Sequence, residues 1–260
     1  MKSSINKVFI LCGGLGTRLD YEGRLKAKPM VKIGPDPILM HIIKNFSVQK
    51  YNEFIFCLGH KSNTIINYFV KANKKRIKII IKKKNYIKFS YSSKKIKFVG
   101  NLIFTGKNTG TGGRILKAYK YLNLNEDFLM TYGDGLSNVR INKLVKFHYK
   151  NKSMITLTAV RPKQRYGVLK IKEKKVVYFD NKNKKTDIFI NGGFFVISKE
   201  AVSKIKSNQI YWEKEPLSYF LKLKKLYAFK HEGFWKSLDT LKDKNDFDEM
   251  IRKNIKPWII

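Results

Sequence analysis

An apolar stretch that runs directly into a glycine-rich turn is the feature that most restricts how this chain can fold. Residues 8–18 read VFILCGGLGTR, and the apolar run before the first glycine has the length and composition of a buried strand. Glycines let the backbone turn sharply and approach a ligand closely, because no Cβ intervenes. Successive N–H groups in such a turn can point at phosphate oxygens, and Arg18 adds a fixed positive charge. We therefore expect a central strand and a phosphate-binding turn, although a turn that only packs has the same pattern.

Strand and helix patterns alternate after this turn. Asp36 is the predicted N-cap, and Pro37 the predicted first residue, of a helix that continues to about Gln49. A strand over 53–58 and a helix over about 63–71 are expected next. This alternation predicts a parallel sheet with right-handed crossovers. Lysines that alternate with apolar residues over 76–104 predict charged edge strands. Further strands are expected at 128–132, 155–160, 168–171, 176–179, 188–197 and 226–230, and further helices at 115–122, 141–149, 216–223 and 240–253.

Composition narrows the class of protein. The 260 residues contain 43% apolar residues, too many for a disordered chain, and include no Pro/Ser-rich linker. We expect one α/β domain, residues 1–260. The chain has no apolar run of 18 residues and no signal-peptide pattern, so we expect a cytoplasmic protein that does not insert into a membrane. Cys12 and Cys57 form neither a disulfide framework nor a metal motif, and Cys12 is expected to be a small buried residue.

The charge is strongly positive but does not indicate specific nucleic-acid binding. Lys and Arg total 55 against 19 acidic residues, a net charge of +36, and only eight of the 55 are Arg. Arg is the residue that makes bidentate base and phosphate contacts, and the lysines are spread over nearly the whole chain. We expect non-specific attraction to polyanions and no specific nucleic-acid partner.

Two of the few carboxylates stand at special positions. Asp134 follows a predicted buried strand and lies between two glycines, at the carboxyl end of a strand where α/β sheets bind ligands. One or two carboxylates together with substrate phosphates suit Mg²⁺. Asp239 is a candidate second ligand, but it could instead cap the helix that begins near Thr240. The histidines have no recognisable Ser or Cys partner, which favours phosphoryl or nucleotidyl transfer, where the substrates supply the nucleophile.

The motifs resemble a known enzyme family. GGLGTRL with KPMVKIG resembles the sugar-1-phosphate nucleotidylyltransferases, and YGDG (132–135), INGGFFV (190–196), WEKEPL (212–217) and GFWKSLDTLKDK (233–244) resemble the glucose-1-phosphate cytidylyltransferases among them. The resemblance covers essentially the whole chain. It implies a Rossmann-like nucleotide-diphospho-sugar transferase fold with a mixed, mainly parallel central sheet and a smaller β-rich sugar-binding part. It also implies homo-oligomers, Mg²⁺, and conversion of CTP and α-D-glucose 1-phosphate to CDP-glucose and pyrophosphate.

The resemblance assigns roles to individual residues. Residues 1–150 would bind nucleotide, and residues 151–260 would bind the sugar phosphate and supply the C-terminal helices. Arg18 and Lys28 would be catalytic, through the charge on the phosphates, and Asp134 and Asp239 would hold the metal. The nucleotide-binding residues would be Leu11, Cys12, Gly13, Gly14, Leu15, Gly16, Thr17, Arg18, Lys28, Thr109, Arg114 and Gly133. The sugar-phosphate-binding residues would be Tyr166, Gly167, Lys182, Asn191 and Gly192.

One departure from the family leaves alternatives open. Where the family has Glu-Lys-Pro, this chain has Asn181-Lys182-Asn183, so an acid that would accept hydrogen bonds from sugar hydroxyls is absent. A related enzyme that uses another sugar 1-phosphate or another nucleotide is therefore an alternative. A non-catalytic polyanion-binding protein with the same fold is a second one, and the presence of Arg18, Lys28 and both aspartates argues against it.

Overall fold

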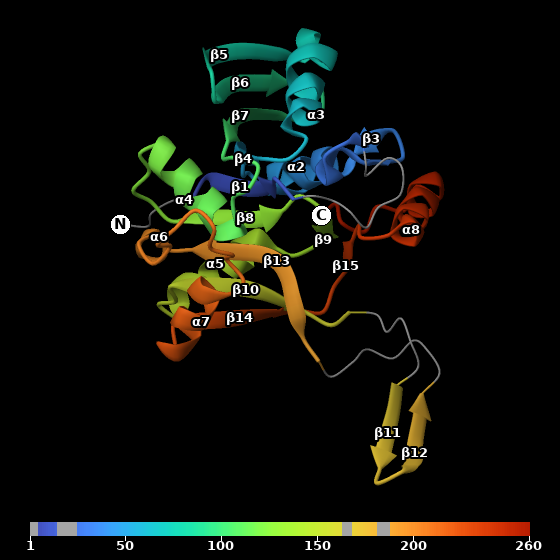
Figure 1. The fold of residues 1–260 in the computed structure, drawn as a ribbon. Helices are drawn as coiled ribbons and strands as arrows, with labels where there is room; N and C mark the ends of the chain where they lie inside the picture. The colour runs from blue at the N-terminus through green and yellow to red at the C-terminus, as the bar shows by residue number, and fades with distance from the viewer. Residues whose placement is uncertain (1–4, 15–24, 163–167, 181–187) are drawn as a thin grey trace.

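The computed structural model describes residues 5–14, 25–162, 168–180 and 188–260. A nine-stranded sheet forms its centre, in the order β14-β10-β13-β8-β1-β4-β7-β6-β5 (Figure 1). The strands of this sheet are β1 (Lys7–Cys12), β4 (Glu53–Leu58), β5 (Ile77–Lys83), β6 (Tyr86–Ser92), β7 (Lys97–Phe104), β8 (Phe128–Tyr132), β10 (Ile155–Val160), β13 (Ile190–Ile197) and β14 (Leu226–His231). Short two-stranded ladders join β2 (Lys32–Ile33) to β3 (Asp36–Pro37), β9 (Gly135–Ser137) to β15 (Trp235–Ser237), and β11 (Val168–Lys172) to β12 (Lys175–Asp180).

The central sheet is mixed and mainly parallel. β1 lies between β4 and β8 and is parallel to both, and β7 continues the parallel set beyond β4. β13 is antiparallel to β8 and to β10, and β6 is antiparallel to β5 and to β7. This arrangement confirms the α/β class and the mixed sheet predicted from the sequence.

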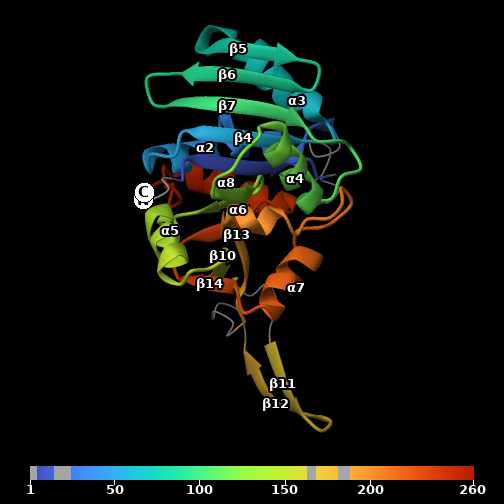
Figure 2. The same ribbon diagram turned by 90° about the vertical axis from the view of Figure 1, so that its left-hand side faces the viewer.

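Apolar side chains of β1 reach both faces of the sheet, as a central strand requires. Val8 and Ile10 pack into one buried cluster, whereas Phe9 and Leu11 pack into the other. α2 (Ile38–Val48), α3 (Ser62–Ile66), α5 (Ile141–Lys150) and α8 (Leu241–Arg252) contribute to the first cluster; α4 (Thr111–Tyr121), α6 (Lys199–Val202) and α7 (Glu215–Lys222) contribute to the second. Figure 2 shows α4, α6 and α7 in front of the sheet. The sheet is therefore covered by helices on both faces.

Several element boundaries differ from the expectation. The predicted cap of α2 is wrong: Pro37 is the N-cap residue and makes no side-chain bond, while Asp36 accepts a hydrogen bond from Lys44 at 2.6 Å. α4 begins at Thr111 rather than at residue 115, because its glycines pack directly against a backbone segment. A Cβ on Gly113 would overlap the carbonyl of Asn208. The lysine-rich edge is confirmed, since β5 is the last strand on its side of the sheet.

Candidate active site

The site lies where the order of the parallel strands reverses. From β1 the chain proceeds to β4 and β7 on one side, and then returns to β8 on the other. Ligands of open α/β sheets bind at such a point, outside the carboxyl ends of the strands. A cavity of about 750 Å³ opens there, and we call it the nucleotide-side cavity because the described residues that were expected to bind nucleotide line it. It is lined by Leu11, Cys12, Gly13, Gly14, Lys28, Pro29, Lys107, Asn108, Thr109, Gly110, Thr111, Arg114, Tyr132, Gly133, Asp134, Gln209, Tyr211 and Asp239.

The short ladder between β9 and β15 brings Asp134 and Asp239 together. Ser237 pairs with Gly135 in this ladder, and Leu238 N–H donates to the carbonyl of Asp134 at 2.8 Å. The two aspartates flank this point of contact. The alternative role of Asp239 as a helix cap is not realised: α8 is capped by Thr240 in a capping box with Asp243. Asp239 thus remains available to the cavity.

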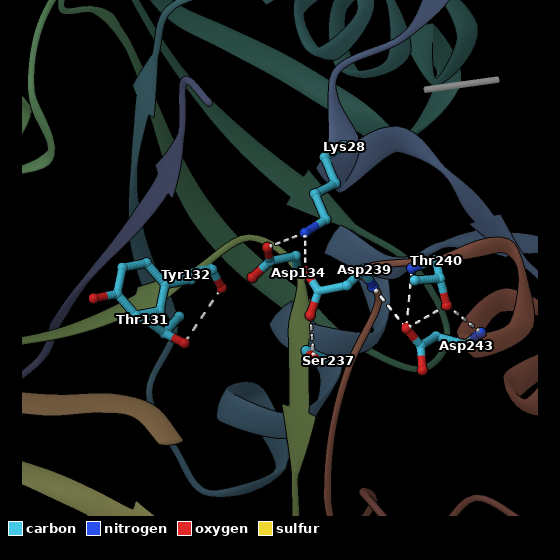
Figure 3. Close-up of polar contacts among 8 residues, drawn as sticks. All are labelled: Lys28, Thr131, Tyr132, Asp134, Ser237, Asp239, Thr240 and Asp243. Carbon is cyan, nitrogen blue, oxygen red and sulfur yellow. Dashed lines mark hydrogen bonds and ion pairs between the residues drawn. The ribbon is translucent and has the colours of Figure 1, made fainter. Parts of the chain in front are cut away.

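Lys28 bridges the two aspartates (Figure 3). Its Nζ lies 2.6 Å from Asp134 Oδ2 and 2.7 Å from Asp239 Oδ1, and Ser237 donates to Asp239 Oδ2 at 2.6 Å. Burial alone would lower the pKa of Lys28, but the two carboxylates raise it above its usual value. Burial would likewise raise the pKa of Asp239, but Lys28 and Ser237 hold it below its usual value. The carboxylates therefore converge on a cation, which in this structure is an ammonium group.

A second cavity adjoins the first. Its volume is about 250 Å³, and we call it the sugar-side cavity because Asn191 and Gly192, which were expected to bind the sugar phosphate, line it. Tyr132, Asp134 and Asp239 line both cavities. The other residues that line it are Thr131, Gly135, Asn191, Gly192, Gly193, Trp235 and Ser237. The two aspartates consequently stand at the boundary between two spaces that could hold two substrates.

Arg114 donates hydrogen bonds to three segments in the wall of the nucleotide-side cavity. Its side chain is buried, and Nη2 donates to the carbonyls of Gly13 at 3.0 Å and Lys107 at 3.2 Å. Nη1 donates to the carbonyls of Leu58 at 3.1 Å and Gly106 at 2.7 Å, and to Thr105 Oγ1 at 2.9 Å. A side chain with this many protein acceptors holds the cavity wall in place.

The glycine turn allows the close approach that Arg114 requires. A Cβ on Gly13 would overlap the guanidinium of Arg114, whereas a Cβ on Gly14 would meet no atom within 4 Å. Cys12 is buried beside the turn, and burial raises the pKa of its thiol well above the usual value. A thiol in this state is not a nucleophile, in agreement with the structural role expected for Cys12.

The structure brings together those predicted site residues that it describes. Leu11, Cys12, Gly13, Gly14, Lys28, Thr109, Arg114, Gly133, Asp134 and Asp239 line the nucleotide-side cavity, and Asn191 and Gly192 line the sugar-side cavity. Leu15, Gly16, Thr17, Arg18, Tyr166, Gly167 and Lys182 lie outside the described residues. None of the four histidines, all of which are described, lines either cavity. His41 is buried against the edge of Trp258, which agrees with the packing role expected for it.

Some lining residues were not predicted. Tyr132 belongs to the YGDG motif and Trp235 to the GFWKSLDTLKDK motif, but their positions in the sequence predicted no role for them. Trp235 Nε1 donates to the carbonyl of Gly192 at 2.7 Å and so attaches β15 to β13. Gln209 and Tyr211 come from a segment without a regular pattern, and only the packing of α4 against it brings them to the cavity.

No helix among the residues that the structure describes has the length and apolar character needed to cross a membrane.

Comparisons with known proteins agree with this arrangement. Glucose-1-phosphate cytidylyltransferase of Salmonella typhimurium is 37% identical over 252 residues, which cover 97% of this chain and 98% of that protein. The probable glucose-1-phosphate cytidylyltransferase of Bacillus subtilis is 33% identical over 260 residues and covers similar shares. Among solved structures, HddC from Yersinia pseudotuberculosis superimposes with a TM-score of 0.66 at 24% identity, over 95% of this chain and all of that one.

A match to a sequence profile identifies the family of this chain. The profile described as Nucleotidyl transferase matches residues 7–248, which include both aspartates and the glycine turn. Together with the full-length relatives, this match shows that the chain belongs to the nucleotidyl transferase family.

Proposed function

We propose that this protein is a glucose-1-phosphate cytidylyltransferase, which converts CTP and α-D-glucose 1-phosphate to CDP-glucose and pyrophosphate. The observation that carries the proposal is the pair of aspartates at the boundary of two cavities, with Lys28 between them. The substrates are proposed from the printed names of relatives that are 37% and 33% identical over nearly the whole chain.

A divalent cation fits the aspartates. Asp134 Oδ2 and Asp239 Oδ1 already approach one positive charge to within 2.7 Å, and Lys28 Nζ serves as the stand-in for the ion. Among the described residues, no group of three or more His, Cys, Asp or Glu side chains could hold a metal ion by itself, so phosphate oxygens of the substrates would complete the coordination. Two carboxylates with substrate phosphates are the usual ligands of Mg²⁺, and we propose Mg²⁺ as the cofactor. When bound, it would neutralise negative charge on the phosphates and help to hold them in line.

The chain's own residues would position the substrates. In the proposed reaction, an oxygen of the sugar phosphate forms a bond to the α-phosphorus of CTP. The bond from the α-phosphorus to the oxygen that bridges to the β-phosphorus breaks, and that electron pair leaves with pyrophosphate. No protein base is needed, because the attacking oxygen is already ionised at neutral pH.

We propose the following division of tasks. Leu11 to Gly14, with Thr109, Arg114 and Gly133, hold the nucleotide beside the glycine turn, and Lys28 and Arg18 stabilise charge on the leaving pyrophosphate. Asn191, Gly192, Tyr166, Gly167 and Lys182 hold the sugar phosphate. We also propose that the protein acts in the cytoplasm. We further propose that it forms a homo-oligomer, and light scattering would measure the mass of that oligomer.

A substrate panel tests the function. Pyrophosphate release is measured for four nucleoside triphosphates, each combined with several sugar 1-phosphates, with and without Mg²⁺. The proposal expects the highest kcat/KM with CTP and glucose 1-phosphate. Another preferred pair would instead favour a related nucleotidylyltransferase, an alternative prompted by Asn181 and Asn183. Absence of turnover with CTP and glucose 1-phosphate overturns the proposal.

A further inference from the structure

The carboxylate of Glu213 joins residues from the walls of both cavities. Its Oε2 accepts a hydrogen bond from Thr111 Oγ1 at 2.6 Å, and its Oε1 accepts one from the Tyr132 hydroxyl at 2.6 Å. Thr111 is the first residue of α4 and lines the nucleotide-side cavity, whereas Tyr132 is the last residue of β8 and lines both. Glu213 is not among the described lining residues of either cavity. It therefore acts on the cavities only through these two side chains.

The segment that carries Glu213 is held in place without its carboxylate. Gly110 N–H donates to the carbonyl of Asn208 at 2.9 Å, and Gly113 N–H donates to the carbonyl of Ile210 at 3.2 Å. The Trp212 side chain next to Glu213 is fully buried. These backbone hydrogen bonds and the buried Trp212 side chain already hold the segment against α4. The position of the segment therefore does not depend on the two hydrogen bonds that the Glu213 carboxylate accepts.

The ring of Tyr132 is fixed from two sides. It packs edge-on against Phe195, with ring centroids 6.0 Å apart at 87°. On the other side it lies so close to Gly193 that a Cβ there would come within 2.8 Å of the Tyr132 ring. Packing of the ring therefore sets the position of the Tyr132 hydroxyl oxygen. It does not set the direction in which the hydroxyl hydrogen points.

Glu213 determines the direction of the Tyr132 hydroxyl hydrogen. The phenol has a single hydrogen, and Glu213 receives it, so the oxygen is left to accept hydrogen bonds. Asn191 Nδ2, from the sugar-side cavity, lies 3.4 Å from this oxygen, a weak contact that a better donor could replace. Sugar hydroxyls are donors of the required kind.

We propose that Tyr132 is a specificity-determining residue that accepts a hydrogen bond from a hydroxyl of the sugar, and that Glu213 is the positioning residue that orients it. This inference rests on the proposed function, because it assigns the sugar-side cavity to the sugar. Thr111 donates to the second oxygen of Glu213, so both carboxylate oxygens of this exposed residue have a hydrogen-bond donor.

Steady-state kinetics with four variants tests the assignment. Tyr132→Phe keeps the ring packing and removes only the hydroxyl; Glu213→Ala removes the bond that orients it. We expect each to raise the KM for the sugar phosphate about tenfold, the effect of losing one hydrogen bond, and to change the KM for CTP less than twofold. Glu213→Gln retains an oxygen that can accept from Tyr132, and should restore most of the sugar affinity. Glu215→Ala is the matched control, because it removes the same charge from the first turn of α7 and should leave both KM values unchanged.

Deoxy analogues of the sugar phosphate identify the contact. In the wild type, one deoxyglucose 1-phosphate should show a raised KM because it lacks the hydroxyl that Tyr132 contacts. In Tyr132→Phe the same analogue should bind no worse than glucose 1-phosphate, since the partner is already gone. Wild-type turnover combined with an unchanged sugar KM in Tyr132→Phe, or with equal changes for both substrates, overturns this inference alone. Absence of wild-type turnover with every sugar 1-phosphate overturns the proposed function and the inference with it.

Discussion

Replacing Lys28 with Met should let a divalent cation bind to the protein in the absence of nucleotide. In the structure, the Lys28 ammonium lies 2.6 Å and 2.7 Å from the oxygens of Asp134 and Asp239, where a metal ion would have to approach. An incoming ion must therefore displace it, and the two charge-assisted bonds are lost in that exchange. Met has a similar length and leaves both carboxylates without a cation.

The size of the effect follows from those two bonds. A hydrogen bond to a charged group contributes about 1.5–3 kcal/mol. The lower value applies here, because the side chains of Lys28, Asp134 and Asp239 are 18%, 30% and 33% exposed and water screens them. Two bonds then contribute about 3 kcal/mol, which corresponds to an approximately 100-fold tighter dissociation constant for the ion.

Titration with Mn²⁺ measures this directly. Free Mn²⁺ gives a six-line electron paramagnetic resonance signal that broadens on binding, so no catalytic turnover is needed. Lys44→Met is the matched control, because it breaks a similar ion pair, to Asp36 at 2.6 Å, that lies outside both cavities. If Mn²⁺ binds Lys28→Met no more tightly than the wild type, Lys28 does not compete with the metal, and the assignment of the aspartates as metal ligands loses its support.

Three further predictions concern the same site and the core. Asp134→Asn should lower kcat at least 100-fold with little change in melting temperature, measured by pyrophosphate release and thermal unfolding. Gly13→Ala should lower the melting temperature and raise the KM for CTP, because its Cβ overlaps Arg114, whereas Gly14→Ala should leave the melting temperature unchanged. Burial lowers the pKa of His148 to about 4, so unfolding takes up a proton as the pH falls below about 6.5, and the stability contributed by the neutral ring is lost between pH 6.5 and pH 4. Urea unfolding at pH 7 and pH 4.5 should show His148→Gln losing about 2.5 kcal/mol less than the wild type; equal losses would contradict it.

The sequence was sufficient for the elements whose residue pattern is local. β4, β8 and β10 have the predicted bounds, because each is an apolar run that ends at a glycine or a change in polarity. The parallel pairing of β4 with β1 followed from the helix between them. The lysine-rich edge was also predictable, since a strand such as β5 can carry lysines only where it meets water.

The remainder depended on contacts that are distant in the chain. β9 and β15 each have only three residues, and each forms a strand only by pairing with the other. No local sequence pattern therefore predicted them. For the same reason, the sequence identified Asp134 and Asp239 as candidate metal ligands but could not show that Lys28 lies between them. Glu213 belongs to the WEKEPL motif, yet its proposed role depends on partners more than 80 residues away in the sequence.

The ladder between β9 and β15 also sets the order in which the chain can become active during its synthesis. Residue 134 leaves the ribosome about a hundred residues before residue 239, and until the second strand of the ladder arrives, only one aspartate of the pair exists. A nascent chain could complete β1, β4, β7 and β8 and still lack one of the two aspartates proposed to hold the metal. Activity therefore requires the segment that carries β15 and Asp239, and fragments that end before it should be inert.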